Sequence, residues 1–522
     1  MNDRQSFLQG TLVLLAANLF NRVLGFVYQI FLIRLIMPEG LGLINMVYPI
    51  YVLVLVLATA GIPVAISKLV AEEMAVHNLR GAYRIFKLCF LIMIVNSIIF
   101  SALCFLGAPF LLEHVFPNPR VHIIFLSLLP GIIIVSVCSA FRGYFQGLQQ
   151  MSPTALTQAL EQTVRVVCGL TLASLLLPRG LEYAAAGASL GVVAGELAGL
   201  SLMLLIYRKK RPPMAGVAAT FPDEPAVRSA LRIFNLAVPV TLTRFGSTAL
   251  MSIDAVLIPL RLQAGGLNLN EATSTFGQFV GISQSLLFTP GIITISMATA
   301  LIPAVSDALA LHRSKLVRSR CEEAVRITLL AGLPCAAILF LLSEELCGLI
   351  FGYPEAGGAL KILALGGPFL YLQQTTTGIL QGLGQAYRPF YNLILASIFK
   401  ITCIYYLTAL PQFSIRGTAA ALVVGFVLMA WLNLADLRRL TGFRIEDSSY
   451  LPKALLATAG MGPLLIYFQH CVYSWTHSEL QATFSAILAG LSGYIFLLIL
   501  SGGIKGTDLQ RLARTLSPNS RL

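Results

Sequence analysis

The first long apolar run of the chain, residues 10–36, reads GTLVLLAANLFNRVLGFVYQIFLIRLI. About 20 predominantly apolar residues are enough to cross a bilayer as a helix. The run is preceded by a single basic residue, Arg4, and contains no clear small-residue cleavage site. We therefore expect an uncleaved first transmembrane helix rather than a signal peptide.

Similar runs recur along all 522 residues. Hydrophobic residues make up 57 % of the chain and charged residues 11 %, against about 25 % charged residues in an ordinary soluble protein. This small number of charged residues cannot cover a water-soluble surface. Lipid must therefore solvate most of the chain. The prediction is an all-α membrane protein with fourteen transmembrane helices. The expected spans are 10–36, 43–67, 86–112, 121–141, 154–177, 184–207, 233–260, 276–302, 324–342, 357–380, 391–410, 415–436, 453–470 and 480–501.

The basic residues predict the orientation. The net charge is +13, with 36 lysines and arginines. Most of these fall in alternate loops, including Arg142 after the fourth span and the cluster 208–211. Cytoplasmic loops carry such an excess, so we expect both termini in the cytoplasm and a multi-pass protein of the cytoplasmic (inner) membrane. The same distribution explains the basic charge without nucleic acid as a partner.

Three short sequence words recur in the same order in the two halves of the chain, at offsets of 235, 240 and 230 residues. They are 145–148 with 380–383, 62–65 with 302–305, and 187–189 with 417–419. Each half would hold six helices, so the two lobes should share one orientation and be related by a pseudo-two-fold axis along the membrane normal.

This duplication predicts the domain boundaries. The expected parts are an N-lobe (1–207), a cytoplasmic linker (208–232), a C-lobe (233–450), a C-terminal helix pair (451–501) and a cytoplasmic tail (502–522).

Four basic residues lie near the middle of expected spans: Arg22, Arg165, Arg244 and Lys400. A cation at the bilayer centre costs about 2.5–3.5 kcal/mol on the insertion scale. The acids at similar depth are Glu161, Glu196 and Asp254, and Glu161 lies four residues before Arg165, the spacing of an intrahelical ion pair. Three acids cannot neutralise four bases, so we expect a central cavity with surplus positive charge that binds an anionic head group. The acids would balance charge or couple transport, and candidate polar residues for the cavity wall are Asn18, Asn21 and Thr243.

A charged cavity between apolar helices suits an amphiphile with an anionic head and a lipid tail, such as a polyprenyl-diphosphate-linked saccharide. An inside-negative membrane potential would favour outward movement of that head. Coupling to this potential, or to H⁺ or Na⁺, is a hypothesis. No cofactor is expected.

Several stretches carry a resemblance to a known family. These are Phe141–Gly147, Pro153–Ala155, Glu161–Gln162 with Val164–Val166, and the opening segment Asn21–Phe26. With the duplicated six-helix unit, they resemble the polysaccharide-transport branch of the multidrug/oligosaccharidyl-lipid/polysaccharide exporter superfamily, over essentially the whole chain.

The resemblance implies a flippase that works by alternating access in a two-lobed, V-shaped fold, similar to the flippases of lipid II. It also implies sporulation, with peptidoglycan synthesis for the spore cortex and a location that includes the forespore membrane. In these relatives, first-helix and cavity arginines are taken to bind the diphosphate, and Arg22 best matches the first-helix position. For Arg165, Arg244 and Lys400 the assignment depends more on the charge argument, and the choice of lipid II as substrate rests on analogy alone.

Two alternatives stay open. A cation-coupled multidrug exporter of the same fold would use Glu196 and Asp254, although the first span carries Arg22 and no carboxylate. A non-transporting scaffold would recruit cell-wall synthesis enzymes through its basic loops. An enzyme is not expected, because the sequence contains no catalytic or metal-binding constellation.

Overall fold

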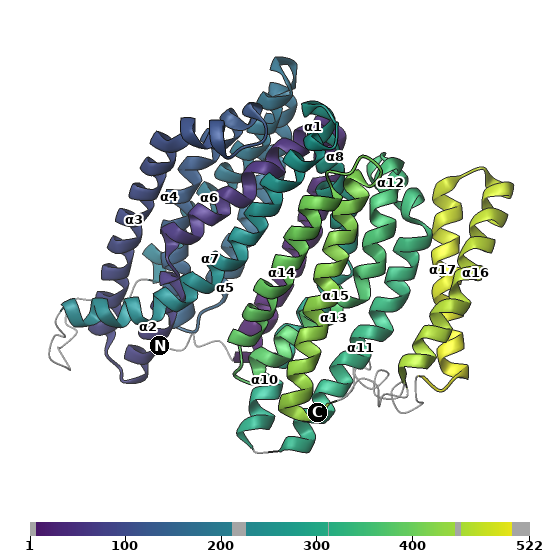
Figure 1. The fold of residues 1–522 in the computed structure, drawn as a ribbon. Coiled ribbons are helices and arrows are strands. Elements are labelled where there is room, and N and C mark those ends of the chain that lie inside the picture. The colour runs from purple at the N-terminus through teal and green to yellow at the C-terminus, as the bar shows by residue number, and fades with distance from the viewer. Residues whose placement is uncertain (1–6, 211–225, 312, 444–449, 504–522) are drawn as a thin grey trace. The chain divides into compact units, whose positions relative to one another are not determined.

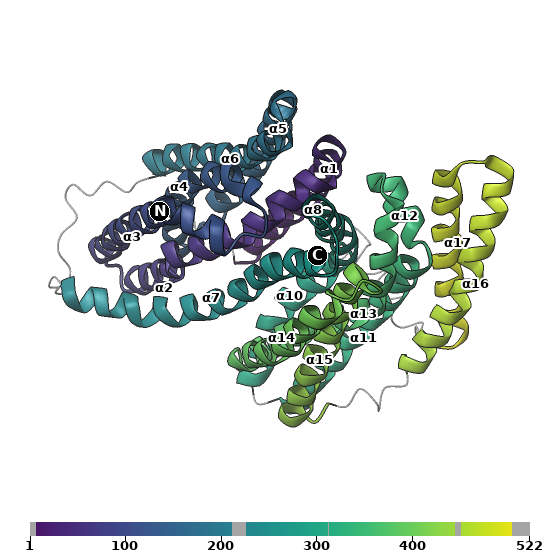
Figure 2. The same cartoon turned by 45° about the horizontal axis from the view of Figure 1, so that its top comes forward.

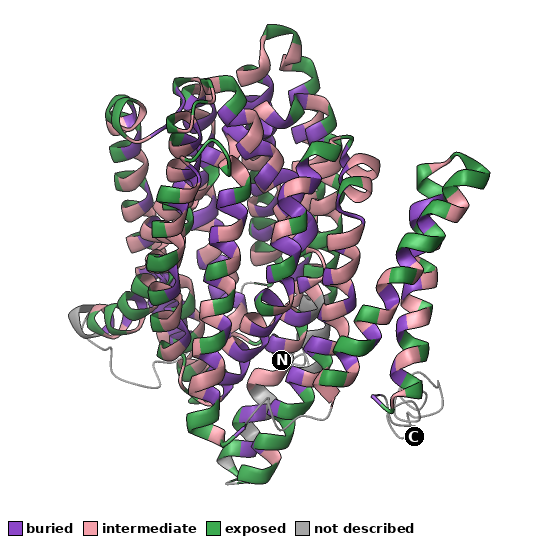
Figure 3. Cartoon of the chain, turned by 45° about the vertical axis from the view of Figure 1, so that its right-hand side comes forward, coloured by how far each residue is buried: buried purple, intermediate pink, exposed green. Residues whose placement is uncertain are grey.

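The computed structural model describes residues 7–210, 226–311, 313–443 and 450–503. These residues form helices joined by short connections, with no strand among them (Figure 1). They divide into two compact units, Met1–Gly281 and Ile282–Leu522. Buried residues gather where helices face one another, while exposed residues lie along the outer helix faces (Figure 3). An all-α membrane protein, as predicted from the sequence, is confirmed.

The described part of the first unit holds eight α-helices. They are α1 (Phe7–Thr59), α2 (Ile62–Ala75), α3 (Leu79–His114), α4 (His122–Gly147), α5 (Ser152–Leu176), α6 (Leu181–Lys210), α7 (Ala226–Ala264) and α8 (Leu269–Gln278). A π-helical segment, Phe279–Gln284, follows α8 and contains the boundary between the units.

Nine α-helices follow among the described residues of the second unit. They are α9 (Ser285–Phe288), α10 (Gly291–Ala310), α11 (Ser314–Leu341), α12 (Ser343–Phe351), α13 (Gly357–Gly382), α14 (Tyr387–Leu407), α15 (Ser414–Thr441), α16 (Tyr450–Thr476) and α17 (Glu479–Leu500). The last two form a hairpin that packs on α11, where the Tyr494 hydroxyl donates a hydrogen bond of 2.8 Å to the Leu330 carbonyl.

Eleven helical segments among the described residues are long and apolar enough to cross a membrane. One of these, Ala16–Ala75, corresponds to the two expected spans 10–36 and 43–67. Between these spans α1 is kinked at Met37 (φ 57°, ψ 168°), just before Pro38. The expected spans 276–302 and 357–380 are not among the eleven. The first is interrupted by the π-helical segment and a turn before Gly291, and the second carries a polar stretch at 373–377. The total of fourteen therefore stays a prediction.

Small residues allow α5 and α6 to pack with their backbones in contact (Figure 2). A methyl group at Gly187 would lie 2.7 Å from the Leu172 carbonyl oxygen, and one at Gly191 would lie 2.3 Å from the Gly169 Cα. Glycines spaced by four residues form one stripe along a helix, which membrane helices use for close approach.

The duplication is visible as matching contacts inside each unit. In the first, methyl groups at Gly143 and Gly147 of α4 would lie 2.6 and 2.8 Å from backbone carbonyl oxygens of α2, those of Pro63 and Ser67. In the second, methyl groups at Gly378 and Gly382 of α13 would lie 2.7 and 2.9 Å from carbonyl oxygens of α10. Those carbonyls belong to Ala298 and Ile302. All four glycine and carbonyl positions are related by the same offset of 235 residues.

These contacts correct one of the sequence alignments. The match of residues 62–65 with 302–305 uses an offset of 240, whereas the contacts pair Pro63 with Ala298. The match is wrong by five residues. Its physical reason is that the repeated feature is a backbone contact with glycine, which does not require a proline in both copies.

The first unit also contains α7, which the duplication assigns to the C-lobe. Its first turns contact α2, where Arg232 Nη2 lies 3.1 Å from Glu72 Oε2 and a methyl at Gly61 would lie 2.7 Å from the Ala237 carbonyl oxygen. A division by compactness does not test boundaries drawn from sequence duplication, so those boundaries stay a prediction. Most of the expected linker and tail lies outside the described residues.

Candidate functional site

Four charged side chains from three helices of the first unit form a network of ion pairs. Arg165 Nη2 lies 2.8 Å from Glu161 Oε1 and 3.1 Å from Glu196 Oε1. Arg142 Nη2 lies 2.7 Å from Glu161 Oε2. We call these four residues the charge network. Glu161 bridges the two arginines, and Glu196 contacts one of them.

Local sequence explains why the network forms. Glu161 and Arg165 are one turn apart on α5, so both side chains project from the same face. Gly195 of α6 removes a side chain that would otherwise lie 2.6 Å from the Glu161 carbonyl oxygen, which brings the neighbouring Glu196 close to α5. Arg142 comes from the last turns of α4, a helix that packs beside α6 (Figure 1).

The charge network is buried and internally balanced. Side-chain exposure is between 10 % and 19 % for all four residues, and two guanidinium groups face two carboxylates. Removing one partner of such a buried pair destabilises a protein strongly, because the remaining charge is left without compensation. The Nε atoms of both arginines and Glu196 Oε2 are shielded from solvent and have no hydrogen-bond partner among the described residues. The network therefore has unused hydrogen-bonding capacity.

The sequence predicted part of this network. The Glu161–Arg165 ion pair is confirmed, and Glu196 joins it. The placement of Arg142 in an inner loop is wrong, since α4 continues to Gly147 and keeps this residue inside the helix. A hydropathy reading ends a span at the first charged residue. The large apolar side chains of Tyr144 and Phe145 after Arg142 are the sign in the sequence that the apolar helix continues.

Arg22 and Arg244 differ from Arg165 in their surroundings. Both guanidinium groups are on exposed residues of the first unit, in α1 and α7. Gly25, one turn after Arg22, faces the side-chain amide of Gln162, which is next to Glu161 on α5. Among the residues whose side chains are described, neither guanidinium has a hydrogen-bond or ion-pair partner. These two arginines therefore present positive charge that no acid of the described chain neutralises.

The remaining predicted residues have varied environments. Lys400 is half-buried in α14 of the second unit, where its Cβ would lie 3.3 Å from a methyl group at Gly425. Asp254 is half-buried in α7, with Oδ1 shielded from solvent. On α1, Asn18 is exposed and Asn21 is half-buried. Thr243 of α7 is exposed, and its hydroxyl donates a hydrogen bond of 3.0 Å to the Pro239 carbonyl. A single cavity shared by the four predicted cations stays a prediction.

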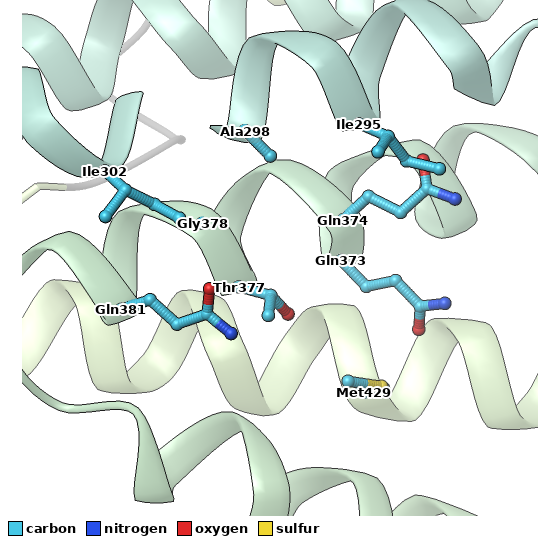
Figure 4. Close-up of a pocket in the computed structure, with 9 residues that line it drawn as sticks. All are labelled: Ile295, Ala298, Ile302, Gln373, Gln374, Thr377, Gly378, Gln381 and Met429. Carbon is cyan, nitrogen blue, oxygen red and sulfur yellow. The ribbon is translucent and has the colours of Figure 1, made fainter. Parts of the chain in front are cut away.

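A second polar site, which sequence reasoning missed, lies wholly within the second unit. It is a cavity of about 310 Å³ between α10, α13 and α15 (Figure 4). We call it the amide pocket, because three glutamines and one threonine of α13 line it together with apolar residues. The lining residues are Ile295, Ala298, Ile302, Gln373, Gln374, Thr377, Gly378, Gln381 and Met429. The available signal was the polar run 373–377 inside an expected transmembrane span.

No group of three or more His, Cys, Asp or Glu side chains that could hold a metal ion occurs in the described part of the chain. The charge network has only two carboxylates, and each of them contacts an arginine. Its chemistry is thus that of ion pairing.

Many helices that are apolar and long enough to cross a membrane, with buried ion pairs between three of them, indicate a multi-pass membrane protein. The chain belongs to the family described as polysaccharide biosynthesis protein, whose model matches residues 7–309. A second family model, MatE, matches residues 279–406.

Individual relatives agree with this assignment. The chain is 32 % identical to stage V sporulation protein B of Bacillus subtilis (strain 168), over 98 % of both chains. It is 24 % identical to the lipid II flippase MurJ of the same organism, over 93 % of both chains. Among solved structures, an inward-facing multidrug resistance MATE family transporter of the MOP superfamily matches with a TM-score of 0.66 and 14 % identity. That match covers 81 % of this chain and 94 % of the transporter, and it shows a shared fold.

Proposed function

We propose that this protein is a flippase that moves a polyprenyl-diphosphate-linked saccharide across the cytoplasmic membrane by alternating access. The substrate would be a peptidoglycan precursor of the lipid II type, used for the spore cortex. The resemblance to stage V sporulation protein B and to the lipid II flippase supports this substrate class. The excess of basic residues in alternate loops supports cytoplasmic termini.

The observation that carries the proposal is the exposed pair of arginines, Arg22 and Arg244. Each is part of an apolar helix, where a charged group is retained at a cost of a few kcal/mol. An anionic head group compensates that cost, and a diphosphate accepts several hydrogen bonds from guanidinium groups at once. Arg165 is already neutralised by carboxylates, so we assign it to the support of the site rather than to the first contact with the head group.

The acids of the charge network are the candidates for coupling. Glu196 Oε2 is buried without a hydrogen-bond partner among the described residues, so this carboxylate has room for a proton or another donor. Movement of a net negative head group outward would also use the membrane potential, worth about 2.3 kcal/mol per charge per 100 mV.

The test is flipping of a fluorescent lipid-linked disaccharide by the purified protein in proteoliposomes. Arg22→Ala and Arg244→Ala should each lower the flipping rate about 10–100-fold, the size of one charge-assisted interaction. Arg22→Lys should retain more activity than Arg22→Ala. Arg179→Ala, which removes an exposed arginine at a helix end, is the matched control and should flip at the wild-type rate. Normal flipping by both alanine variants would refute the proposal.

A multidrug exporter is the second candidate, favoured by the MATE-type fold and the buried Glu196. Export of ethidium from the same proteoliposomes, without movement of the lipid-linked saccharide, would select it. A scaffold for cell-wall enzymes would support sporulation even when both arginines are replaced.

A further inference from the structure

The amide pocket presents uncharged hydrogen-bonding groups on one face of α13. Gln373, Thr377 and Gln381 follow one another at intervals of four residues, so their side chains form a row toward the pocket (Figure 4). The side-chain amides of Gln373 and Gln381 have no hydrogen-bond partner among the described residues. Both groups can therefore donate to and accept from a ligand.

The other polar residues of the pocket are held by neighbouring helices. Thr294 of α10 donates 2.5 Å to Gln374 Oε1, which leaves the amide hydrogens of Gln374 as the free donors. Asn433 of α15, fully buried, donates 3.2 Å to Thr377 Oγ1. This contact fixes Thr377 and orients its hydroxyl hydrogen away from Asn433. Thr377, the middle residue of the row, is thus held by a hydrogen bond from α15, and Gln374, beside the row, is held by one from α10.

The opposite wall is apolar. Ile295, Ala298 and Ile302 of α10 face the glutamines, and Met429 of α15 closes one side (Figure 4). A mostly aliphatic lining with a few amide groups along one side matches a pyranose ring, which has C–H groups on its faces and hydroxyl or acetamido groups at its edge. The volume of about 310 Å³ is at the small end for ligand sites, which suits one or two sugar rings and excludes a whole lipid-linked precursor.

In the sequence duplication, part of this pocket corresponds to part of the charge network. With the offset of 235 residues, Thr377 corresponds to Arg142 and Lys400 to Arg165, while the position of Glu161 is occupied by Ala396. The second copy therefore has a hydroxyl, a lysine and a methyl side chain at the positions where the first copy holds three of its buried charged residues.

We propose that the amide pocket binds the saccharide of the transported lipid through Gln373, Gln374, Thr377 and Gln381. This inference rests on the proposed flippase function for the identity of the ligand. The pocket would give a preference for a sugar-bearing lipid over the same polyprenyl diphosphate without sugar.

The experiment compares two lipids and one soluble sugar on the full-length protein. The lipids are a polyprenyl diphosphate with an N-acetylhexosamine disaccharide and the same polyprenyl diphosphate without sugar, and the soluble probe is the free disaccharide. Gln373→Leu and Gln381→Leu should each weaken binding of the sugar-bearing lipid about 2–10-fold, the value of a neutral hydrogen bond. Binding of the bare diphosphate should be unchanged. Gln481→Leu, at an exposed glutamine of α17, is the control and should leave both affinities unchanged.

The outcomes separate this inference from the proposed function. Equal losses for both lipids, or none for either, would overturn the saccharide site while leaving the flippase proposal standing on diphosphate binding. If the wild type binds neither lipid, the flippase proposal fails. Saturation-transfer NMR with the free disaccharide then decides the pocket: a signal in the wild type that Gln373→Leu abolishes supports it, and equal signals refute it. Unfolding temperatures within about 2 °C of the wild type would show that the variants fold, since these amides make no internal hydrogen bond.

Discussion

Arg142 Nη2 lies 2.7 Å from Glu161 Oε2, so the consecutive helices α4 and α5 are joined by an ion pair in the interior of the first unit. Glu161 also binds Arg165, which makes this carboxylate the centre of the charge network. Replacing it leaves Arg142 with no carboxylate in contact.

Glu161→Gln should therefore destabilise the protein by about 3–5 kcal/mol, the typical cost of breaking a buried ion pair. The measurement is thermal unfolding of the purified protein in detergent. The matched control is Glu322→Gln, which breaks an exposed pair with Arg318 at 3.0 Å and should cost less than about 1 kcal/mol. Equal effects of the two substitutions would contradict a buried network.

The glycine stripe of α6 gives a second prediction. In Gly191→Ala the new methyl group would lie 2.3 Å from the Gly169 Cα, so α5 and α6 must separate. Such overpacking costs about 1–3 kcal/mol. Gly107→Ala is the control, because a methyl group there meets nothing within 4 Å. The prediction fails if the unfolding temperatures of the two variants shift alike.

The kink of α1 at Met37 gives a third prediction. Met37 has φ 57°, a conformation that favours glycine, and the residue is 51 % exposed. Met37→Gly should relieve strain of about 1–3 kcal/mol and leave the protein as stable as the wild type or more stable. Met251→Gly, at an exposed methionine inside regular helix α7, should instead cost about 1 kcal/mol. A larger loss at Met37 than at Met251 would exclude a strained kink.

Asn433, in the second unit, gives a fourth prediction. This fully buried side chain donates to Thr376 and Thr377 and accepts 2.9 Å from Asn392 Nδ2. Asn433→Ala leaves these partners without their bonds and should destabilise the protein by about 1–3 kcal/mol. Thr402→Ala, at an exposed hydroxyl of α14, should change the unfolding temperature little. Unaltered stability of the Asn433 variant would argue against this hydrogen-bond network.

The sequence predicted features that depend on local spacing. Apolar runs gave the helices, and the four-residue interval gave the Glu161–Arg165 pair, because both follow from helix geometry alone. Arg142 could not be placed in the same way. Its partner is on another helix, and a charged residue near the end of an apolar run is equally compatible with a loop.

The amide pocket was harder still to predict. Its glutamines come from one polar run on α13, but the apolar wall comes from α10 and the support from Asn433 on α15. A sequence read one helix at a time contains no information on which faces of three helices meet. The same limit explains why the match of residues 62–65 with 302–305 is wrong by five residues. That match aligns the prolines, whereas the repeated feature is a contact between glycine and a carbonyl of another helix.

Those glycine contacts have an evolutionary consequence. Gly143 and Gly378 each press against a carbonyl of the neighbouring helix, so the shape of each copy is held by main chain and not by the side chains beside it. Side chains next to such a glycine–carbonyl contact can be replaced while the two helices keep their packing. Equivalent positions of the two copies therefore tolerate different side chains, arginine at 142 and threonine at 377, while the same main-chain contact is kept in both.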